Sequence, residues 1–390
     1  MKSNWPLVKL EEVADLTVGF VGTMAKHYTP NGVTFLRSTN IDPFNISLDD
    51  IKYISPEFNE KLSKSQLRTG DVVIVRTGKP GACAVIPNIS GTWNCSDLVI
   101  VRPHTEKLDP LFLAAYINLA SGTINNQLVG AVQQHFNVAS AKRLEIPVPS
   151  IDVQRKISSL IGNLNDKISI NNKINDNLQQ QALAIFQQEL LRDGELPEGW
   201  SIGSLLDIAN YLNGLAMQKF RPTDGENGLP VLKIKELRQG SCDASSELCS
   251  PSIKPEYIVH DGDVIFSWSG SLLVDLWCGG TCGLNQHLFK VTSDKYPKWF
   301  YYAWTAHHLA RFVAIAADKA TTMGHIKREE LAKAEIVIPD AASMERIGGI
   351  LQPMYDLIIS NRIENRKLAA LRDTILPQLM SGELDVSDIT

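Results

Sequence analysis

An internal repeat at close to half the chain length constrains the fold more than any other feature of this sequence. Similar segments led by tryptophan open the two halves at Trp5 and Trp200, which lie 195 residues apart. Three further matches follow in the same order at spacings of 192, 190 and 190 residues: residues 70–74 with 262–266, His135 with His325, and residues 145–149 with 335–339. An ordered series with a slowly drifting spacing indicates two equivalent halves whose loops differ slightly in length.

Both halves begin with short apolar runs bounded by Gly, Pro, Asn and Asp, a pattern typical of strands. The predicted strands are residues 71–76, 98–102, 263–267 and 288–291, and short helices are predicted at 110–119 and 297–311. Beyond Pro149 and Pro339 the apolar spacing changes to that of a long helix. Each half is therefore predicted to be a β-rich domain followed by a helix.

The two predicted long helices carry apolar residues at alternating steps of three and four, which is the seam of two packed helices. The seams comprise Val153, Ile157, Leu160, Leu164, Ile168, Leu178, Ile185 and Phe186, and Ile347, Leu351, Met354, Ile358, Leu368, Ile375 and Leu379. Asparagines interrupt both seams at matching places, where they are expected to fix helix register: Asn171, Asn175, Asn361 and Asn365. Two amphipathic helices in separate cores are the alternative. Pro353 and Pro377 predict a kink or an end in the second helix.

These patterns predict an α+β protein with two β-rich domains in a pseudo-twofold arrangement, joined by two long antiparallel helices. A helix of about 38 residues spans roughly 57 Å, so the pair is expected to act as a spacer. The predicted boundaries are residues 1–150 and 194–340 for the domains, 151–193 for the first helix, and 341–390 for the second helix and tail.

The composition agrees with a folded protein of two domains and restricts its location and partners. The chain has 390 residues, 44% of them hydrophobic and 21% charged. The charged N-terminal stretch does not resemble an export signal, and no apolar run approaches the ~18 residues of a membrane span, so a cytoplasmic location is expected. Because the net charge is -5, binding to DNA would depend on local basic clusters.

The six cysteines are expected to be reduced thiols in a chain without an export signal. A zinc site built from Cys242, Cys249, Cys278 and Cys282 is the alternative, although the tight CxxC pairs of zinc sites are missing.

Motifs for catalysis in this chain are weak. The Gly-Lys pair at Gly78 and Lys79 is followed by Pro80 in place of the hydroxyl residue of a phosphate loop. Residues 50–52 formally match the end of a nuclease carboxylate motif, but matches of three residues are common. His135 and His325 have no acid or nucleophile at a suggestive spacing, so contact with DNA or a structural loop role is the better interpretation.

The duplicated motifs resemble those of the specificity subunits of type I restriction-modification systems. The resemblance covers the whole chain and includes Trp5 and Trp200, the two Gly-Asp strand entries, residues 35–41 with 231–235, and residues 146–149 followed by Gln154. The second helix lacks the counterpart of Gln154, since its corresponding segment begins with Met344.

The resemblance implies that each globular domain reads one half of a bipartite DNA sequence while the helices set the gap. It also implies two modification subunits, which would supply S-adenosylmethionine and adenine-N6 methylation. Restriction subunits, where the system has them, would supply ATP- and Mg-dependent cleavage. The chain itself would be a non-catalytic subunit without cofactor or metal, with double-stranded DNA as its ligand and no membrane partner.

Base reading requires forked donors and acceptors on exposed loops. The candidates in the first domain are Arg37, Ser38, Thr39, Asn40, Arg76, Thr77, Lys79, Gln133, Gln134, His135 and Asn137. Those in the second are Lys233, Lys235, Ser267, Trp268, Ser269, Asn285, Gln286, Thr321, Thr322, His325 and Lys327. Lys219 and Arg221 are candidates for contacts with phosphates.

Two other functions remain open at this point. One is a stand-alone DNA modification or restriction enzyme with unrecognised catalytic motifs. The other is a duplicated scaffold that binds carbohydrate or peptide.

Overall fold

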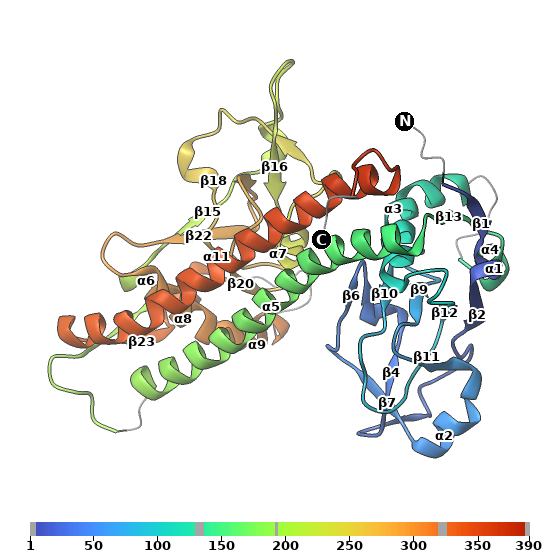
Figure 1. Ribbon diagram of the computed structural model, residues 1–390. Coiled ribbons are helices and arrows are strands. Elements are labelled where there is room, and N and C mark those ends of the chain that lie inside the picture. The colour runs from blue at the N-terminus through green and yellow to red at the C-terminus, as the bar shows by residue number, and fades with distance from the viewer. Residues whose placement is uncertain (1–4, 129–135, 192–193, 319–325, 387–390) are drawn as a thin grey trace. The chain divides into compact units, whose positions relative to one another are not determined.

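The computed structural model describes residues 5–128, 136–191, 194–318 and 326–386. The chain divides into two compact units (Figure 1). Unit 1 comprises Met1–Lys167 and Leu368–Thr390, and unit 2 comprises Ile168–Lys367. Each unit therefore combines one β-rich domain with part of both long helices.

The strands of unit 1 form two main sheets. One has the order β10 (Cys83–Val85), β9 (Val72–Val75), β12 (Leu98–Pro103) and β2 (Ala14–Val18). The other has the order β3 (Tyr28–Thr29), β7 (Lys52–Ile54), β4 (Val33–Leu36), β11 (Trp93–Cys95) and β8 (Gln66–Leu67). The short pairs are β1 (Leu7–Lys9) with β13 (Glu145–Pro147) and β5 (Ile41–Asp42) with β6 (Asn45–Ile46). The short helices are α1 (Leu10–Val13), η1 (Ser38–Asn40), α2 (Pro56–Lys61), η2 (Ser63–Ser65), α3 (Pro110–Leu128) and α4 (Val138–Lys142).

The strands of unit 2 repeat this plan. One sheet has the order β15 (Asn210–Asn213), β22 (Leu288–Thr292), β19 (Val264–Ser267) and β20 (Leu273–Leu276). The other has the order β17 (Leu248–Cys249), β16 (Leu229–Leu232), β21 (Cys282–Leu284) and β18 (Ile258–Val259), and β14 (Ser201–Ser204) pairs with β23 (Glu335–Ile338). The short helices are α6 (Leu205–Ile208), η3 (Met217–Lys219), α7 (Ile234–Gln239), η4 (Pro255–Tyr257), α8 (Lys298–His307), α9 (Leu309–Asp318) and α10 (Arg328–Ala332).

The two domains have matching sheet topologies, which confirms the predicted duplication. The order β10-β9-β12-β2 corresponds to β20-β19-β22-β15, and β7-β4-β11-β8 corresponds to β17-β16-β21-β18. In both units one strand pair of the second sheet is parallel, β4 with β11 and β16 with β21. The four predicted strands coincide with β9, β12, β19 and β22.

Strand β9 shows why an uninterrupted apolar run forms a strand here. Val72 and Ile74 belong to one hydrophobic cluster, whereas Val73 and Val75 belong to another. Successive side chains of a strand point to opposite faces, so a strand between two cores is apolar at every position. Strand β19 likewise divides its side chains between two clusters.

The repeated Gly-Asp pair forms the same turn at the start of β9 and β19. Gly70 and Gly262 both have φ of 85°, a left-handed conformation that favours glycine. Asp71 and Asp263 each accept a hydrogen bond from the backbone N–H three residues earlier, at 2.8 Å in both domains. A basic residue then pairs with each carboxylate: Arg102 at 2.7 Å and Lys290 at 2.8 Å.

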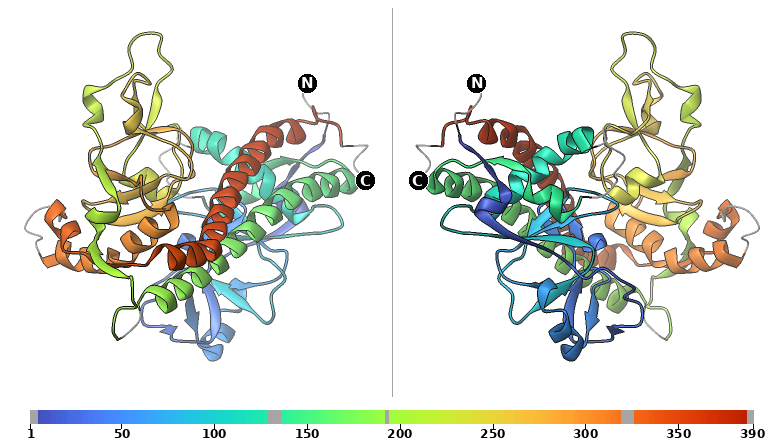
Figure 2. Two further views of the ribbon diagram at one scale, coloured as in Figure 1. Left: turned by 90° about the vertical axis from the view of Figure 1, so that its left-hand side faces the viewer. Right: turned by 90° about the vertical axis from the view of Figure 1, so that its right-hand side faces the viewer.

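The long helices are α5 (Ile151–Leu190) and α11 (Ala341–Met380), each of 40 residues. In unit 2 their side chains pair in antiparallel order: Asn171 with Asn365, Asn175 with Asn361, and Glu189 with Arg346. In unit 1 Arg372 donates to Asn165, which continues the same order. Figures 1 and 2 show the two helices side by side. The antiparallel pair is confirmed.

The two prolines do not end the second helix. Helix α11 runs through Pro353 and Pro377 without interruption. Each proline removes one intrahelical hydrogen bond. The packed seam around them, with Leu351, Tyr355, Leu376 and Leu379 buried, holds the helix together.

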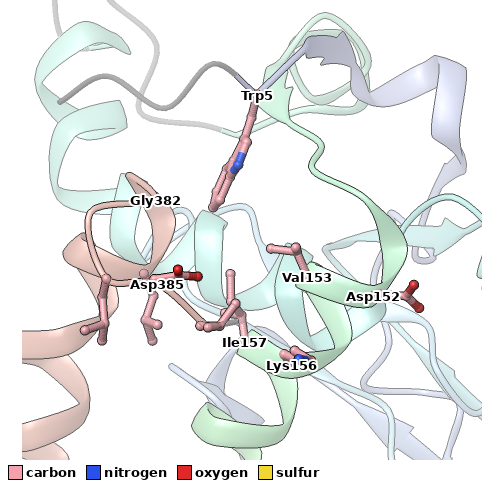
Figure 3. A pocket seen from close by; sticks show the side chains of 10 residues that line it. Trp5, Asp152, Val153, Lys156, Ile157, Gly382 and Asp385 are labelled. Carbon is pink, nitrogen blue, oxygen red and sulfur yellow. The ribbon is translucent and has the colours of Figure 1, made fainter. Parts of the chain in front are cut away.

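A small hollow lies in unit 1 where the C-terminal segment covers the start of α5. Its volume is about 250 Å³, and Figure 3 shows Trp5, Val153 and Ile157 facing Gly382 and Asp385 across it. Val386, which also lines this hollow, is buried in the same core as Leu10 and Ile157. The first and last described segments of the chain thus share one core.

A search of the described helices finds none with the length and apolar character that crossing a membrane requires.

Candidate nucleic-acid interface

Three loops converge in unit 2 at the edge where the parallel strands β16 and β21 end. Lys233 follows β16, Ser269 lies beyond β19, and Asn285 with Gln286 follows β21. They border a hollow of about 490 Å³. Its lining comprises Met217, Gln218, Arg221, Lys233, Ile234, Lys235, Glu247, Ser269, Gly270, Asn285, Gln286 and His287. Six of the sequence-predicted candidates are thereby brought to one place.

A single carboxylate, that of Glu247, holds two of the cations that line this hollow. Glu247 Oε1 pairs with the Lys233 ammonium, while its Oε2 lies 3.0 Å from Arg221 Nη2. The bond to Lys233 is the main reason that the pKa of Glu247 lies below its usual value, and the Lys233 and Arg221 charges lower it further. Lys235 lies 2.8 Å from Ser245 Oγ and 3.5 Å from Asp243. The cations are therefore positioned before any ligand arrives.

The opposite side presents amide, hydroxyl and imidazole groups. Asn285 Oδ1 accepts from the backbone N–H of His287 at 3.3 Å, and the His287 ring bridges Ser269 Oγ at 3.2 Å and Gln286 Nε2 at 3.3 Å. The Trp268 ring packs against Phe289, and its Nε1 donates to Asn213 at 2.9 Å. Amide and imidazole groups of this kind donate to and accept from base edges.

Unit 1 brings equivalent loops together. The N–H of Ser96 donates to Leu36 O at 3.0 Å, just as that of Asn285 donates to Leu232 O at 3.2 Å. Arg37 and Lys233 therefore occupy matching positions after their strands. The loops beyond β9 and β19 also match, since each contains a glycine with positive φ, Gly78 and Gly270.

Cations in the unit 1 loops are also paired with acids. Arg37 Nη2 lies 3.0 Å from Asp50 Oδ2, and Lys79 Nζ lies 2.6 Å from Asp42. Arg76 Nη1 lies 3.0 Å from Asp97 Oδ1 as an ion pair without an aligned hydrogen bond. These loops thus present basic groups whose charges are locally compensated.

A model of the type I restriction modification DNA specificity domain matches residues 2–180 and again 197–371. The chain belongs to this family. The two matched segments coincide with the two halves of the repeat, so this family member carries the specificity domain twice.

Relatives agree over almost the whole length of the chain. The MjaIX specificity subunit of a type I restriction enzyme from Methanocaldococcus jannaschii is 26% identical over 99% of this chain and 95% of its own. The MjaX specificity subunit of the same organism, described as putative, is 21% identical over 98% and 94%. A crystal structure of a type I restriction-modification S subunit from M. genitalium matches with a TM-score of 0.54 at 14% identity, covering 96% of both chains. That structure supports the fold.

Two of the residues predicted to contact DNA lie inside their loops, and a third caps a helix. Asn40 is 1% exposed, and its amide donates to the backbone oxygens of Ser47 and Asp49. Ser267 is fully buried and donates within its own turn. Asn137 caps α4 by accepting from the N–H of Ser140 at 2.9 Å. Asn40 and Ser267 stabilise loops from within, so they do not offer side chains to DNA.

The other predicted contacts differ in where they lie. Thr39, Lys79, Lys219 and Lys327 are exposed, while Ser38 is half-buried. Thr77 donates to Asp97 at 2.6 Å beside Arg76. Predicted residues outside the described part of the chain are Gln133, Gln134, His135, Thr321, Thr322 and His325. The described residues that follow these gaps join the loops at matching places, because Phe136 donates to Arg76 O and Ile326 donates to Trp268 O.

Sequence reasoning missed the acidic members of the interface. Asp50, Asp97 and Glu247 each hold a predicted DNA-contacting cation. Asp97 and Glu247 stand in the sequence as isolated charges, whereas Asp50 belongs to the segment that formally matches a nuclease carboxylate motif. Non-glycine residues with positive φ are uncommon, and Asp50 and Asp97 have φ of 50° and 54°. The sequence gives no sign that any of the three acids pairs with a cation of the interface.

The seam asparagines pair across the two long helices. Asn171, Asn175, Asn361 and Asn365 hydrogen-bond between α5 and α11, and their role in fixing register stays a prediction.

The four-thiolate zinc hypothesis is wrong, because no group of three or more potential ligands forms among the described residues, which include all six cysteines. Cys278 donates to backbone oxygens at Leu276 and Ile359 instead.

Proposed function

We propose that this specificity subunit reads a bipartite DNA target, one half-site for each recognition domain. The observation that carries the proposal is the duplicated convergence of three loops, which follow β4, β9 and β11 in unit 1 and β16, β19 and β21 in unit 2. Each set combines Arg or Lys with hydroxyl or amide groups. Arg and Lys donate to guanine and to phosphate, and Asn and Gln pair with adenine.

The long helices are proposed to set the gap between the half-sites. Side chains pair across α5 and α11 from Glu189 with Arg346 to Asn165 with Arg372, so the relative register of the helices is fixed at several levels. Because each unit contains part of both helices, inserting residues into one helix alone would disrupt the pairing. Matched insertions of four residues in both helices would lengthen the gap and preserve the pairing.

The helices also offer apolar surface for partner subunits. In unit 2, Ile170 is 52% exposed on α5, and Ile350 and Leu357 are 46% and 45% exposed on α11. Ile350 and Leu357 are seven residues apart and share a helix face. Exposed apolar residues grouped in this way are typical of an interface. We assign this surface to two modification subunits, joined by restriction subunits where the system has them.

Catalysis is assigned to those partners. In this proposal S-adenosylmethionine, ATP and Mg²⁺ belong to the modification and restriction subunits, and the chain contributes target choice without a cofactor of its own. The subunit would therefore act on cellular DNA in the cytoplasm.

Methylome sequencing of the host with and without the gene for this chain tests the proposal. We expect one bipartite methylated motif to disappear with the gene. Substituting Lys233 with Ala should relax the motif in one half-site, and substituting Arg37 with Ala should relax the other. A motif that survives the deletion, or one without two halves, would contradict the proposal.

A further inference from the structure

In each unit, one acid pairs with the cation that follows the parallel strand β4 or β16, and this acid lies at a similar place in both folds. In unit 2, Glu247 directly precedes β17, the strand next to β16, and its backbone oxygen accepts from Val231 at 2.7 Å. Its carboxylate reaches Lys233 at the end of β16 and Arg221 on the preceding loop. One acid thus joins two cations that arise from separate segments.

Unit 1 contains the same arrangement with other residues. Strand β7 lies beside β4 as β17 lies beside β16, and Asp50 is two residues before Lys52, the first residue of β7. Asp50 Oδ2 lies 3.0 Å from Arg37, and its Oδ1 lies 2.5 Å from Lys52. The hydrogen bond to Lys52 is the main cause of the lowered pKa of Asp50, followed by that to Arg37. Both domains therefore hold two cations on one carboxylate.

The register of the strands shows that Glu247 and Asp50 do not occupy equivalent positions in the two domains. Phe35 pairs with Lys52 in unit 1, and Pro230 pairs with Leu248 in unit 2. Since Phe35 corresponds to Val231, Lys52 occupies in unit 1 the position that Glu247 occupies in unit 2. Asp50 is two residues earlier, in a turn where its φ is 50°, and its carboxylate still reaches Arg37. The two domains thus form the same electrostatic arrangement with acids at different positions. A purely structural role of one side chain would not explain why the arrangement recurs.

A carboxylate in this place competes with DNA. Cations that are free to meet phosphates provide the affinity for DNA of any sequence. A carboxylate bound to the same cations has the charge and acceptor geometry of a phosphate oxygen pair, so DNA must displace it. A random duplex must displace the carboxylate to gain its phosphate contacts, whereas a cognate duplex also gains contacts to base edges and therefore depends less on the cations that the carboxylate holds.

We propose that Glu247 and Asp50 are specificity-determining residues that restrain the DNA-contacting cations of their domains until a cognate half-site replaces the carboxylate. The inference rests on the proposed function and adds a mechanism of discrimination to it. Gln286 lines the same hollow as Glu247 and would supply sequence-dependent contacts. This contribution distinguishes a cognate half-site from a random one.

Neutralising Glu247 gives the decisive measurement. The chain, in the complex that it forms in its host, is titrated with a random-sequence 30-base-pair duplex and with a duplex that carries the methylated motif, at several salt concentrations. With Glu247→Gln we expect the affinity for random DNA to rise about tenfold and that for cognate DNA to rise less. Release of one or two cations should steepen the slope of log affinity against log salt by about 1 to 2.

Two controls separate this mechanism from a general charge effect. Glu256→Gln removes the same charge at an exposed position of η4 in the same domain, and it should leave the slope unchanged. In a chain that already carries Arg221→Met and Lys233→Met, adding Glu247→Gln should have no further effect, because the cations that it would release are missing. Asp50→Asn, which tolerates the left-handed backbone at that position, should reproduce the Glu247→Gln result in unit 1.

The outcomes also separate the inference from the function on which it rests. If wild-type complexes distinguish the motif but Glu247→Gln changes neither the salt slope nor the affinity ratio, the restraint is wrong and the proposed function stands. An equal effect of Glu256→Gln would likewise overturn the restraint. If wild-type complexes bind no DNA in a sequence-dependent manner, the proposed function fails first.

Discussion

Unit 1 and unit 2 share a sheet topology but attach their long helices by different chemistry. In unit 1 the fully buried Gln154 of α5 donates to the backbone oxygens of Lys107 and Pro149 and accepts from the N–H of Asp109, each at 2.9 Å. In unit 2 the matching residue of α11, Met344, packs against the hydrophobic core. A polar anchor and an apolar contact thus occupy equivalent positions.

Ion pairs take over the anchoring in unit 2. Arg366 binds Asp261 through two nitrogens, both at 2.7 Å, and Arg362 Nη1 lies 2.7 Å from Asp275. The bond to Asp261 is the largest cause of a raised pKa at Arg366. Buried amide bonds are insensitive to salt, whereas partly exposed ion pairs weaken as salt rises. The duplicated fold therefore tolerates different solutions to one packing problem, provided that each solution fixes the helix.

Exchanging the anchors should give the largest effect. Gln154→Met leaves three backbone groups without their partner, so it should lower the free energy of unfolding by about 2–4 kcal/mol. Met344→Gln, the reciprocal change, should cost about 1 kcal/mol because the site is half-buried. Urea unfolding, with hydrogen exchange measured on peptides of each unit, checks both values. Equal losses would show that Gln154 is not the anchor.

The second largest effect is expected from substitutions in the seam between the helices. Asn361→Leu removes the donor of the 2.9 Å bond to the buried Asn175 and should cost about 1–2 kcal/mol. Adding Asn175→Leu should restore most of that loss, since two apolar residues then face each other. A double variant less stable than the single variant would contradict this account. Asn165→Leu tests the unit 1 end of the seam, where the part-exposed Arg372 can turn to water.

Removal of the ion-paired guanidinium should have a smaller effect. Arg366→Met should destabilise unit 2 by about 1–2 kcal/mol, because Asp261 loses its two hydrogen bonds in a partly exposed site. Lys367→Met removes the same charge from the adjacent exposed position and should cost little. The difference between the two should shrink in 1 M salt. A difference that does not respond to salt would assign the loss to packing instead.

The smallest predicted effect concerns pH and unit 2. Burial is the main cause that lowers the pKa of His308, with the nearby His307 and Arg311 charges acting in the same direction. A base whose pKa is lowered by folding stabilises the folded state above its unfolded pKa of about 6.5, and this contribution is lost as pH falls. The protection factors of unit 2, which relate the intrinsic hydrogen-exchange rate at each pH to the observed rate, should therefore fall between pH 7 and pH 5. His308→Gln should reduce that change, and an unaltered change would assign it to His307.

Much of the architecture could be predicted from residue patterns. The two Gly-Asp pairs, the apolar runs that became β9 and β19, and the long seams led to a duplicated α+β fold with an antiparallel helix pair. Backbone geometry imposes the spacing of apolar residues in strands and helices, and the recurrence of all these features in the second half of the chain indicates the duplication. The candidate interface was predicted less completely. Arg37, Arg76, Lys233 and Gln286 lie on converging loops, but Asn40 and Ser267 proved to be internal.

Local periodicity was sufficient to determine the secondary structure and the duplication, because hydrogen-bonded backbones allow side chains only a few repeating directions. Only the tertiary structure decided which charges meet. Arg366 and Asp261 are 105 residues apart, and Lys233 reaches Glu247 across a strand pair whose register no local pattern encodes. Pairing between ions depends on where chain segments cross in space, so the acids that hold the predicted DNA-contacting cations could be identified only once the fold was known.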